Sequence, residues 1–69
     1  MLDFTFHRKI ARIIKMLADT LHVNLPRAIS IFYRTDTCRL MHDPTTQLHT
    51  MSDTYILNDV IAELREKQG

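Results

Sequence analysis

The fold of this chain is decided by residues 17–29, LADTLHVNLPRAI, in which one helix ends and another begins within a few residues. Asn24 is a good N-cap because its side-chain oxygen can accept a backbone N–H of the following turn. Pro26 then falls in the first turn, where its missing N–H leaves no hydrogen bond unmade. The break from His22 to Asn24 is too short for anything except a tight corner between two helices.

The segment before this corner is predicted to be an amphipathic helix. Its apolar residues recur at spacings of three and four, which places them on one helical face: Phe6, Ile10, Ile13, Ile14, Leu17 and Leu21. We expect Asp3 or Thr5 to cap its start, and we expect the helix to end near Leu21 or His22. The opposite, solvent-facing side carries the basic residues Arg8, Arg12 and Lys15.

The segment after the corner is predicted to be a second helix with one buried face. The apolar residues expected on that inward face are Leu25, Ala28, Ile29, Phe32 and Tyr33. The residues expected to face the solvent on its other side are Arg27, Ser30 and Arg34.

The middle of the chain carries weaker signals. Asp36 is expected to cap a short helix over residues 37–41. Asp43-Pro44 should end that helix, because proline disfavours the helical conformation in the residue before it. Residues 45–51 contain β-branched residues without helical spacing, so we expect an extended connector, or one short strand that has no partner within the chain.

The last segment returns to helical spacing. Ser52 or Asp53 is expected to cap it. Its apolar stripe consists of Ile56, Leu57, Val60, Ile61 and Leu64. Tyr55 lies away from this stripe, and we expect it either to fold back over Leu48 and Met51 or to remain an exposed aromatic side chain.

The composition fits this set of elements and excludes several classes of protein. The chain has 69 residues, of which 45% are hydrophobic and 25% charged, which is too apolar for a disordered chain. The sequence predicts one all-α domain over residues 1–69: a compact bundle of three long helices plus one short helix, with an extended connector before the last helix. Such a small core is marginal alone and gains stability from a partner or a second copy.

Cysteine usage and apolar runs bear on location. The single cysteine, Cys38, cannot form a disulfide within the chain, which fits a reducing compartment. Charged residues among the first nine interrupt any signal peptide, and no run approaches the roughly 20 apolar residues that a membrane span needs. We therefore expect a cytoplasmic protein without a membrane partner.

The residues that carry chemistry form no catalytic or metal-binding pattern. The four histidines and Cys38 show neither Cys-x-x-Cys nor His-x-x-x-His spacing, so we expect no metal and no other cofactor. A nucleophilic Cys38 with His42 four residues later is the enzymatic alternative, and a buried structural cysteine is the simpler interpretation. Asp59 and Glu63 are interpreted as carboxylates on a solvated helix face. The sequence therefore predicts no enzymatic activity.

Charge is distributed unevenly along the chain and indicates a binding partner. Residues 1–35 carry six basic and two acidic side chains, whereas residues 36–69 carry three basic and six acidic ones. Such halves attract each other within one molecule, between copies or towards an external partner. We predict a small non-catalytic protein-binding module whose partner is another protein or a second copy of itself. The candidate contact residues are Arg8, Arg12, Lys15, Tyr55 and Asp59.

A DNA-binding regulator is the alternative function. Residues 17–29 have the cadence of a helix-turn-helix corner, a motif in which the second helix enters the major groove. Arg27, Ser30 and Arg34 would then face the bases, and the basic residues of the first helix would lie near phosphates. The sequence pI of 8.0 is below the strongly basic range typical of nucleic-acid-binding domains, so a protein partner is preferred over DNA.

Residues 48–61, LHTMSDTYILNDVI, resemble the signature of a family of small bacterial proteins of unknown function. In that family a Leu-His-Thr connector precedes a Tyr-Ile-x-x-Asp-Val start of the last helix. The corner at residues 24–28 and Phe32-Tyr33 also fit the family layout, so the similarity covers nearly the whole chain. Asp43-Pro44 and the more basic first helix depart from many members. Members are often encoded beside toxins that resemble ADP-ribosyltransferases, so the resemblance implies an antitoxin-like partner of a neighbouring toxin.

Overall fold

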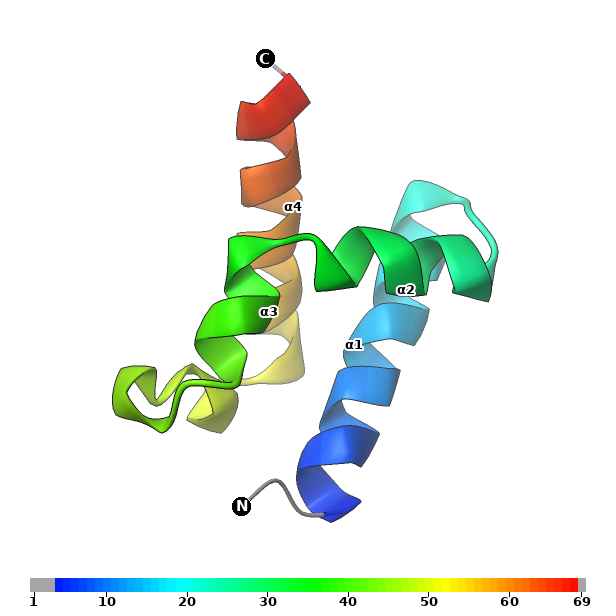
Figure 1. The fold of residues 1–69 in the computed structure, drawn as a ribbon. Coiled ribbons are helices and arrows are strands. Elements are labelled where there is room, and N and C mark those ends of the chain that lie inside the picture. Colours follow the sequence, from blue (N-terminus) through cyan, green and yellow to red (C-terminus); the bar gives the residue numbers. More distant parts are fainter. Residues whose placement is uncertain (1–3, 69) are drawn as a thin grey trace.

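The described residues form four α-helices and two short 3-10 helices (Figure 1). The computed structural model describes residues 4–68, with side chains through residue 67. The elements in chain order are α1 (Phe4–Leu21), α2 (Leu25–Tyr33), α3 (Asp36–Met41), η1 (Pro44–Thr46), η2 (Leu48–Thr50) and α4 (Asp53–Gln68). No strand occurs among residues 4–68, which confirms the all-α prediction. Three long helices are not confirmed, because α2 has 9 residues against 18 in α1 and 16 in α4.

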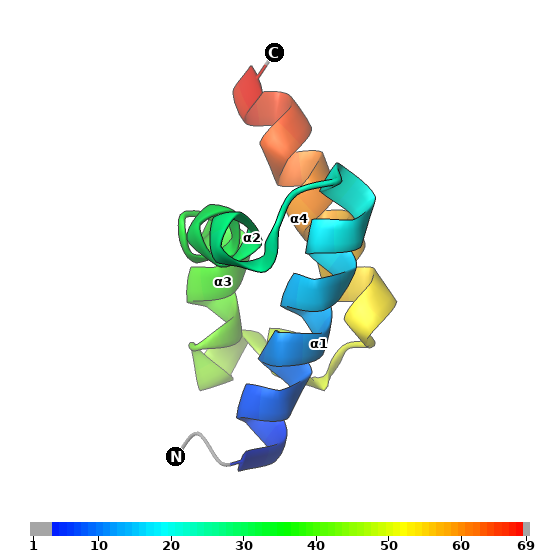
Figure 2. The same cartoon turned by 90° about the vertical axis from the view of Figure 1, so that its right-hand side faces the viewer.

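The two long helices form the frame of the molecule. α1 and α4 run side by side in the same direction, with their N-terminal ends at the bottom of Figure 1. α2 lies across the C-terminal part of α1, and α3 runs back alongside α4 in the opposite direction (Figures 1 and 2). The path through α2 and α3 therefore returns the chain to the lower end, where η1 and η2 lead into α4.

The corner between α1 and α2 forms as the sequence predicts. His22 has a left-handed backbone with φ 58°, and the N–H of Val23 donates to the carbonyl of Ala18 at 3.1 Å. This is the Schellman arrangement that ends many helices. The side-chain oxygen of Asn24 accepts the backbone N–H of Arg27 at 3.0 Å, which confirms Asn24 as the N-cap of α2.

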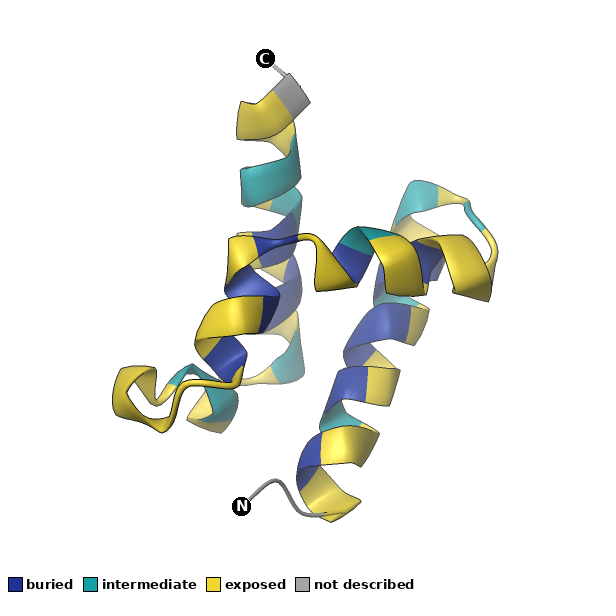
Figure 3. Ribbon diagram, in the orientation of Figure 1, coloured by how far each residue is buried: buried dark blue, intermediate teal, exposed yellow. Residues whose placement is uncertain are grey.

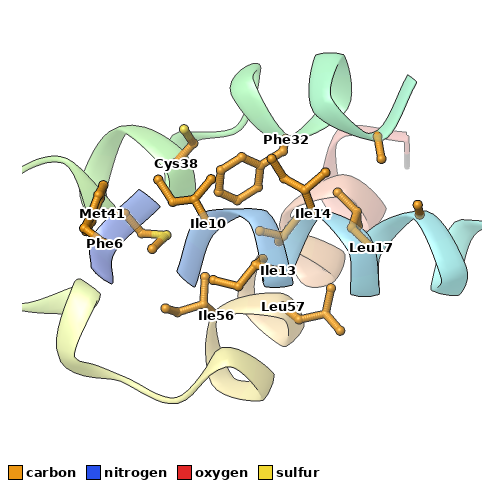
Figure 4. Close-up of a cluster of buried hydrophobic side chains, with 13 residues drawn as sticks. Phe6, Ile10, Ile13, Ile14, Leu17, Phe32, Cys38, Met41, Ile56 and Leu57 are labelled. Carbon is orange, nitrogen blue, oxygen red and sulfur yellow. The ribbon is translucent and has the colours of Figure 1, made fainter. Parts of the chain in front are cut away.

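The hydrophobic core lies where α1, α2, α3 and α4 meet (Figure 3). α1 buries the stripe that its spacing predicts, except that Leu21 is only half-buried. Figure 4 shows the ring of Phe32 lying over α1, next to Ile10 and Ile14. The largest fully buried side chains come from all four helices: Phe32, Ile13, Leu17, Met41, Ile56 and Val60.

The predicted inward face of α2 is wrong for three of its five residues. Ala28 and Phe32 are fully buried. Leu25, Ile29 and Tyr33 are instead 52%, 44% and 55% exposed. At 100° per residue the five apolar residues span about 140° of the helix circumference, which is wider than the contact that a crossing neighbour covers. The exposed three are called the α2 stripe below.

One predicted helix cap is wrong, and one of the two candidates for another is excluded. α3 begins at Asp36, and its N-cap is Thr35, whose Oγ1 accepts the N–H of Cys38 at 3.2 Å. The cap lies one residue earlier than predicted because the threonine hydroxyl reaches this N–H. Thr5 lies inside α1 and therefore does not cap it, and the alternative cap, Asp3, lies outside the described residues.

The last helix begins as predicted and is buried mainly in its first half. Ser52 Oγ accepts the N–H of Tyr55 at 3.1 Å, so Ser52 is the cap. The apolar stripe of α4 is buried through Val60, whereas Ile61 and Leu64 are only half-buried. The second half of the helix therefore leaves part of its apolar face uncovered.

The extended connector predicted over residues 45–51 is wrong. Two 3-10 helices occupy this segment, joined by Gln47 in a left-handed conformation with φ 55°. The carboxylate of Asp43 accepts the N–H and the hydroxyl of Thr45 at 3.0 and 2.7 Å, and the Thr46 hydroxyl donates to the Leu40 carbonyl at 2.7 Å. Short polar side chains can satisfy the backbone of tight turns in this way, which a lone strand could not do.

Candidate functional site

The basic face of α1 is exposed, as its spacing predicts, but it is partly used within the molecule. Arg8, Arg12 and Lys15 are all exposed. The Nε of Arg12 donates to the carboxylate of Asp53 at 2.8 Å, and the Nζ of Lys9 donates to its other oxygen at 2.8 Å. The basic half of the chain and the acidic half therefore attract each other within one molecule at Asp53.

Asp53 links the start of α4 to α1. The hydrogen bond from Arg12 and then that from Lys9 lower the pKa of Asp53 below its usual value. A carboxylate in the first turn of a helix is also favoured by the helix dipole. Arg8 makes a different contact, because its guanidinium lies 5.6 Å from the centre of the Phe4 ring. Lys15 alone of the three candidates on α1 makes no ion pair, hydrogen bond or ring contact within residues 4–67.

The two partner-contact candidates on α4 lie on its outer face. Tyr55 is 51% exposed, which matches the exposed alternative and not the folded-back one, and Asp59 is exposed as well. This face lies opposite the stripe that packs toward α1, so it points away from the core. The basic face of α1 also points away from the same core. The structure therefore does not bring the five candidates together into one surface.

The outer side of α2 holds the three candidates for DNA contact. Arg27, Ser30 and Arg34 are all exposed, as predicted. The α2 stripe flanks them, with its three apolar side chains at positions i, i+4 and i+8. The spacing of the apolar residues predicted that the α2 stripe lies in the core. The wide apolar arc on so short a helix was the signal that part of it would stay exposed.

A groove lies between α2 and the C-terminal parts of α1 and α4, and no pattern in the sequence pointed to it. It has a volume of about 450 Å³. Four apolar side chains, two arginines and one threonine line this groove, which is called the α4 groove below: Leu21, Ile31, Ile61, Leu64, Arg27, Arg65 and Thr20. The groove exists because α1 ends at Leu21 while α4 continues to Gln68 (Figure 1).

Glu63 is a structural carboxylate, so its interpretation as a solvated group is wrong. Its side chain is 14% exposed, and it accepts the backbone N–H groups of Asp36 and Thr37 at 2.6 and 3.0 Å. The Thr37 hydroxyl donates to it at 2.9 Å, and Lys67 lies 3.1 Å away. Burial raises the pKa of Glu63, but the backbone and side-chain hydrogen bonds outweigh burial and bring the pKa from 4.5 to about 2.

Cys38 has the surroundings of a core residue. It is 4% exposed, and burial raises the pKa of its thiol. The Nδ1 of His42 lies 2.8 Å from the Cys38 carbonyl and 3.9 Å from its Sγ. An Nδ1 that donates to a carbonyl carries a proton and cannot accept one from the thiol. Within residues 4–67, no group of three or more His, Cys, Asp or Glu side chains is arranged to hold a metal ion.

Comparison with known proteins adds no functional assignment. No family model, no curated protein and no solved structure matches this chain. The resemblance of residues 48–61 to a small bacterial family therefore stays a prediction. No helix in the described part of the chain is long and apolar enough to cross a membrane.

Proposed function

We propose that this chain is a non-catalytic protein-binding module that docks on another protein through the α2 stripe. The observation that carries the proposal is the exposure of Leu25, Ile29 and Tyr33 in one row along α2. Apolar side chains at this spacing are the usual anchors of a helix that packs on a partner. Tyrosine is also enriched among the residues that contribute most to binding energy.

The small size of the core supports the same proposal. α2 buries only Ala28 and Phe32, so much of its apolar surface does not stabilise the isolated chain. Burial of apolar surface yields roughly 25 cal/mol per Å², so a partner that covers the α2 stripe would stabilise both itself and this domain. The exposed candidates Arg8, Lys15, Tyr55 and Asp59 lie outside the stripe and would extend the contact to a partner that wraps around the molecule.

The partner that we propose is a toxin encoded by a neighbouring gene, which makes the chain antitoxin-like. This rests on the resemblance of residues 48–61 to a family whose members are often encoded beside such toxins. A second copy of the chain is the other candidate partner.

Complex formation with the product of the neighbouring gene tests this proposal. Both proteins would be co-expressed and their complex measured by size-exclusion chromatography with light scattering. We expect a stable complex that Ile29→Glu weakens by at least about tenfold, because the charge would be buried against the partner. Ser30→Glu, a matched change at the next position on α2, should have little effect. A chain that binds neither this product nor itself would contradict the proposal.

A helix-turn-helix DNA-binding regulator is the second candidate function. The exposure of Arg27, Ser30 and Arg34 on α2, directly after a tight corner, favours it. A gel-shift assay on the promoter fragment of its own operon tests this function. Binding should fall steeply with salt and should be lost when Arg27 and Arg34 become alanine. The apolar α2 stripe beside these residues fits protein contact better than a charged DNA backbone, so this function ranks second.

A further inference from the structure

The second half of α4 extends beyond the helices that cover its first half. In Figure 1 its C-terminal turns stand above α2, and Figure 3 shows few buried residues there. The apolar stripe nevertheless continues, with Ile61 and Leu64 half-buried after the fully buried Val60. α1 covers these two residues only in part because it ends at Leu21. The α4 groove is the space that a further helix beside α4 would fill.

The charges around the α4 groove are of one sign. Arg27 reaches it from α2 and Arg65 from α4, and its lining holds no acidic side chain. Within residues 4–67, neither guanidinium has an ion-pair or hydrogen-bond partner. Arg12 and Arg39, by contrast, are paired with carboxylates. A groove lined by apolar side chains and by these two guanidinium groups is complementary to apolar side chains flanked by carboxylates.

We propose that the α4 groove binds an acidic amphipathic helix of a partner protein. Its apolar side chains would pack on Ile61 and Leu64, and its carboxylates would pair with Arg27 and Arg65. This rests on the proposed function and adds a second surface, because Ile31 and Arg27 lie on the opposite flank of α2 from the α2 stripe. One partner could thus hold α2 from both sides.

A second copy of this chain fits the α4 groove poorly. The chain's own exposed acidic helical face carries Asp59 and Glu66, and it lies on the side of α4 turned away from Ile61 and Leu64. A two-fold dimer requires both partners to use the same pair of surfaces at once. With the donor face and the groove on different sides of one helix, two copies could not dock reciprocally. This favours a different protein as the occupant.

Selection from a displayed library of helical peptides tests the inference directly. The library would consist of peptides of about 15 residues, long enough to form a helix on binding, with apolar positions at i, i+4 and i+7 and random flanking positions. We expect the full chain to select peptides rich in Asp and Glu beside the apolar positions. The affinity of a synthesised winner, measured by fluorescence polarisation, should fall at least about tenfold in the Arg27→Glu, Arg65→Glu variant.

A matched variant separates local pairing from net charge. Arg39→Glu combined with Thr5→Glu and Ala11→Glu lowers the net charge by the same amount at exposed positions that do not line the groove, and it should leave the affinity of the peptide nearly unchanged. A winner remade with Lys in place of its acidic residues should bind the groove variant better than the original chain. In spectra of isotope-labelled protein, the bound acidic peptide should shift the amide signals of Ile31, Ile61 and Leu64.

Three outcomes of the peptide experiments would overturn the inference: no peptide is selected, the winners have no acidic preference, or the groove variant and the charge control weaken binding equally. Self-association that Arg27→Glu with Arg65→Glu abolishes would assign the groove to a second copy and would also overturn it. None of these results bears on the α2 stripe, which is tested through Ile29. A chain that binds its neighbouring protein but selects no acidic helix would thus keep the proposed function and lose only this inference.

Discussion

α2 and α3 follow each other in the chain but are held in different ways. α2 has nine residues and buries only two of them, Ala28 and Phe32. α3 has six residues and buries three, and its N-terminal N–H groups are bound by Thr35 and by Glu63 of α4. The shorter helix is therefore the one that tertiary hydrogen bonds fix, at the end where an isolated helix would fray.

This difference separates a structural region from a region that is available for binding. The α3–α4 junction satisfies its polar groups internally, and within residues 4–67 no buried side-chain N or O atom lacks a hydrogen-bond partner. α2 presents apolar side chains on one flank, and on its outer side are Arg27 and Arg34, whose guanidinium groups have no ion-pair or hydrogen-bond partner within residues 4–67. The start of α3 is thus fixed by hydrogen bonds from α4, whereas α2 is held by apolar packing of Ala28, Phe32 and the partly buried Ile31. Variants at each region can measure this division.

The largest expected effect on stability comes from removing the buried ring of Phe32. Phe32→Ala should lower the free energy of unfolding by about 3–5 kcal/mol, which is enough to unfold much of so small a domain. Tyr33→Ala, at the adjacent and half-exposed position, should cost about 1 kcal/mol or less. Urea unfolding followed by far-UV circular dichroism measures both, and similar losses for the two variants would contradict the assignment of the α2 stripe.

The next effect tests the junction. Glu63→Gln should lower the free energy of unfolding by about 2 kcal/mol. Glutamine offers one uncharged oxygen in place of a carboxylate, so the backbone N–H groups of Asp36 and Thr37 lose their charged acceptor. Hydrogen bonds to a charged group contribute about that much. Glu66→Gln removes the same charge from an exposed position of the same helix and should change stability by about 0.5 kcal/mol at most. The measurement is again the urea midpoint at neutral pH. An equal response of the two variants would show that Glu63 does not hold α3.

The same carboxylate should make the junction sensitive to acid. The pKa of Glu63 is about 2 in the folded chain, and its ordinary value is 4.5. The contribution of Glu63 to the free energy of unfolding is therefore complete above that ordinary value. It should decline as the pH falls from 4.5 towards 2, where the folded-state carboxylate becomes protonated. Unfolding free energies measured across this range should fall more steeply for the native chain than for Glu63→Gln. Parallel curves would contradict the assigned pKa.

Sequence patterns predicted the parts of this fold that depend on neighbours along the chain. The α1–α2 corner and its Asn24 cap follow from hydrogen bonds three to five residues apart, and the helical stripes follow from spacing. Glu63 and the α2 stripe could not be identified in this way. Whether Glu63 is solvated depends on α3 packing beside it, and whether Ile29 is buried depends on how much of α2 its neighbours cover.

The same distinction, between features set by neighbouring residues and features set by packing, applies to the candidate binding surfaces. Exposure of Arg8, Lys15 and Arg34 was predictable, because a charged residue opposite an apolar stripe faces water. The α4 groove was not predictable, because it depends on the relative lengths of α1 and α4 and on the crossing of α2 at their upper end. Ile61 and Leu64 look like ordinary core residues in the sequence, and only the packing shows that they are half covered.

The smallest expected effect concerns the two left-handed residues, of which His22 precedes α2 and Gln47 follows α3. A side chain in this conformation crowds the backbone, whereas glycine adopts it without that cost. His22→Gly should therefore stabilise the fold by about 1 kcal/mol, although the greater freedom of glycine in the unfolded chain offsets part of the gain. His22→Ala, which keeps a Cβ, should bring no gain.

Gln47→Gly is the matched change, and because both strains are local to the backbone, the two glycine variants should raise the urea midpoint similarly. A gain at Gln47 with none at His22 would mean that the imidazole of His22 contributes a contact to the α2 corner that offsets its strain, and α2 would then be held more firmly than its burial indicates.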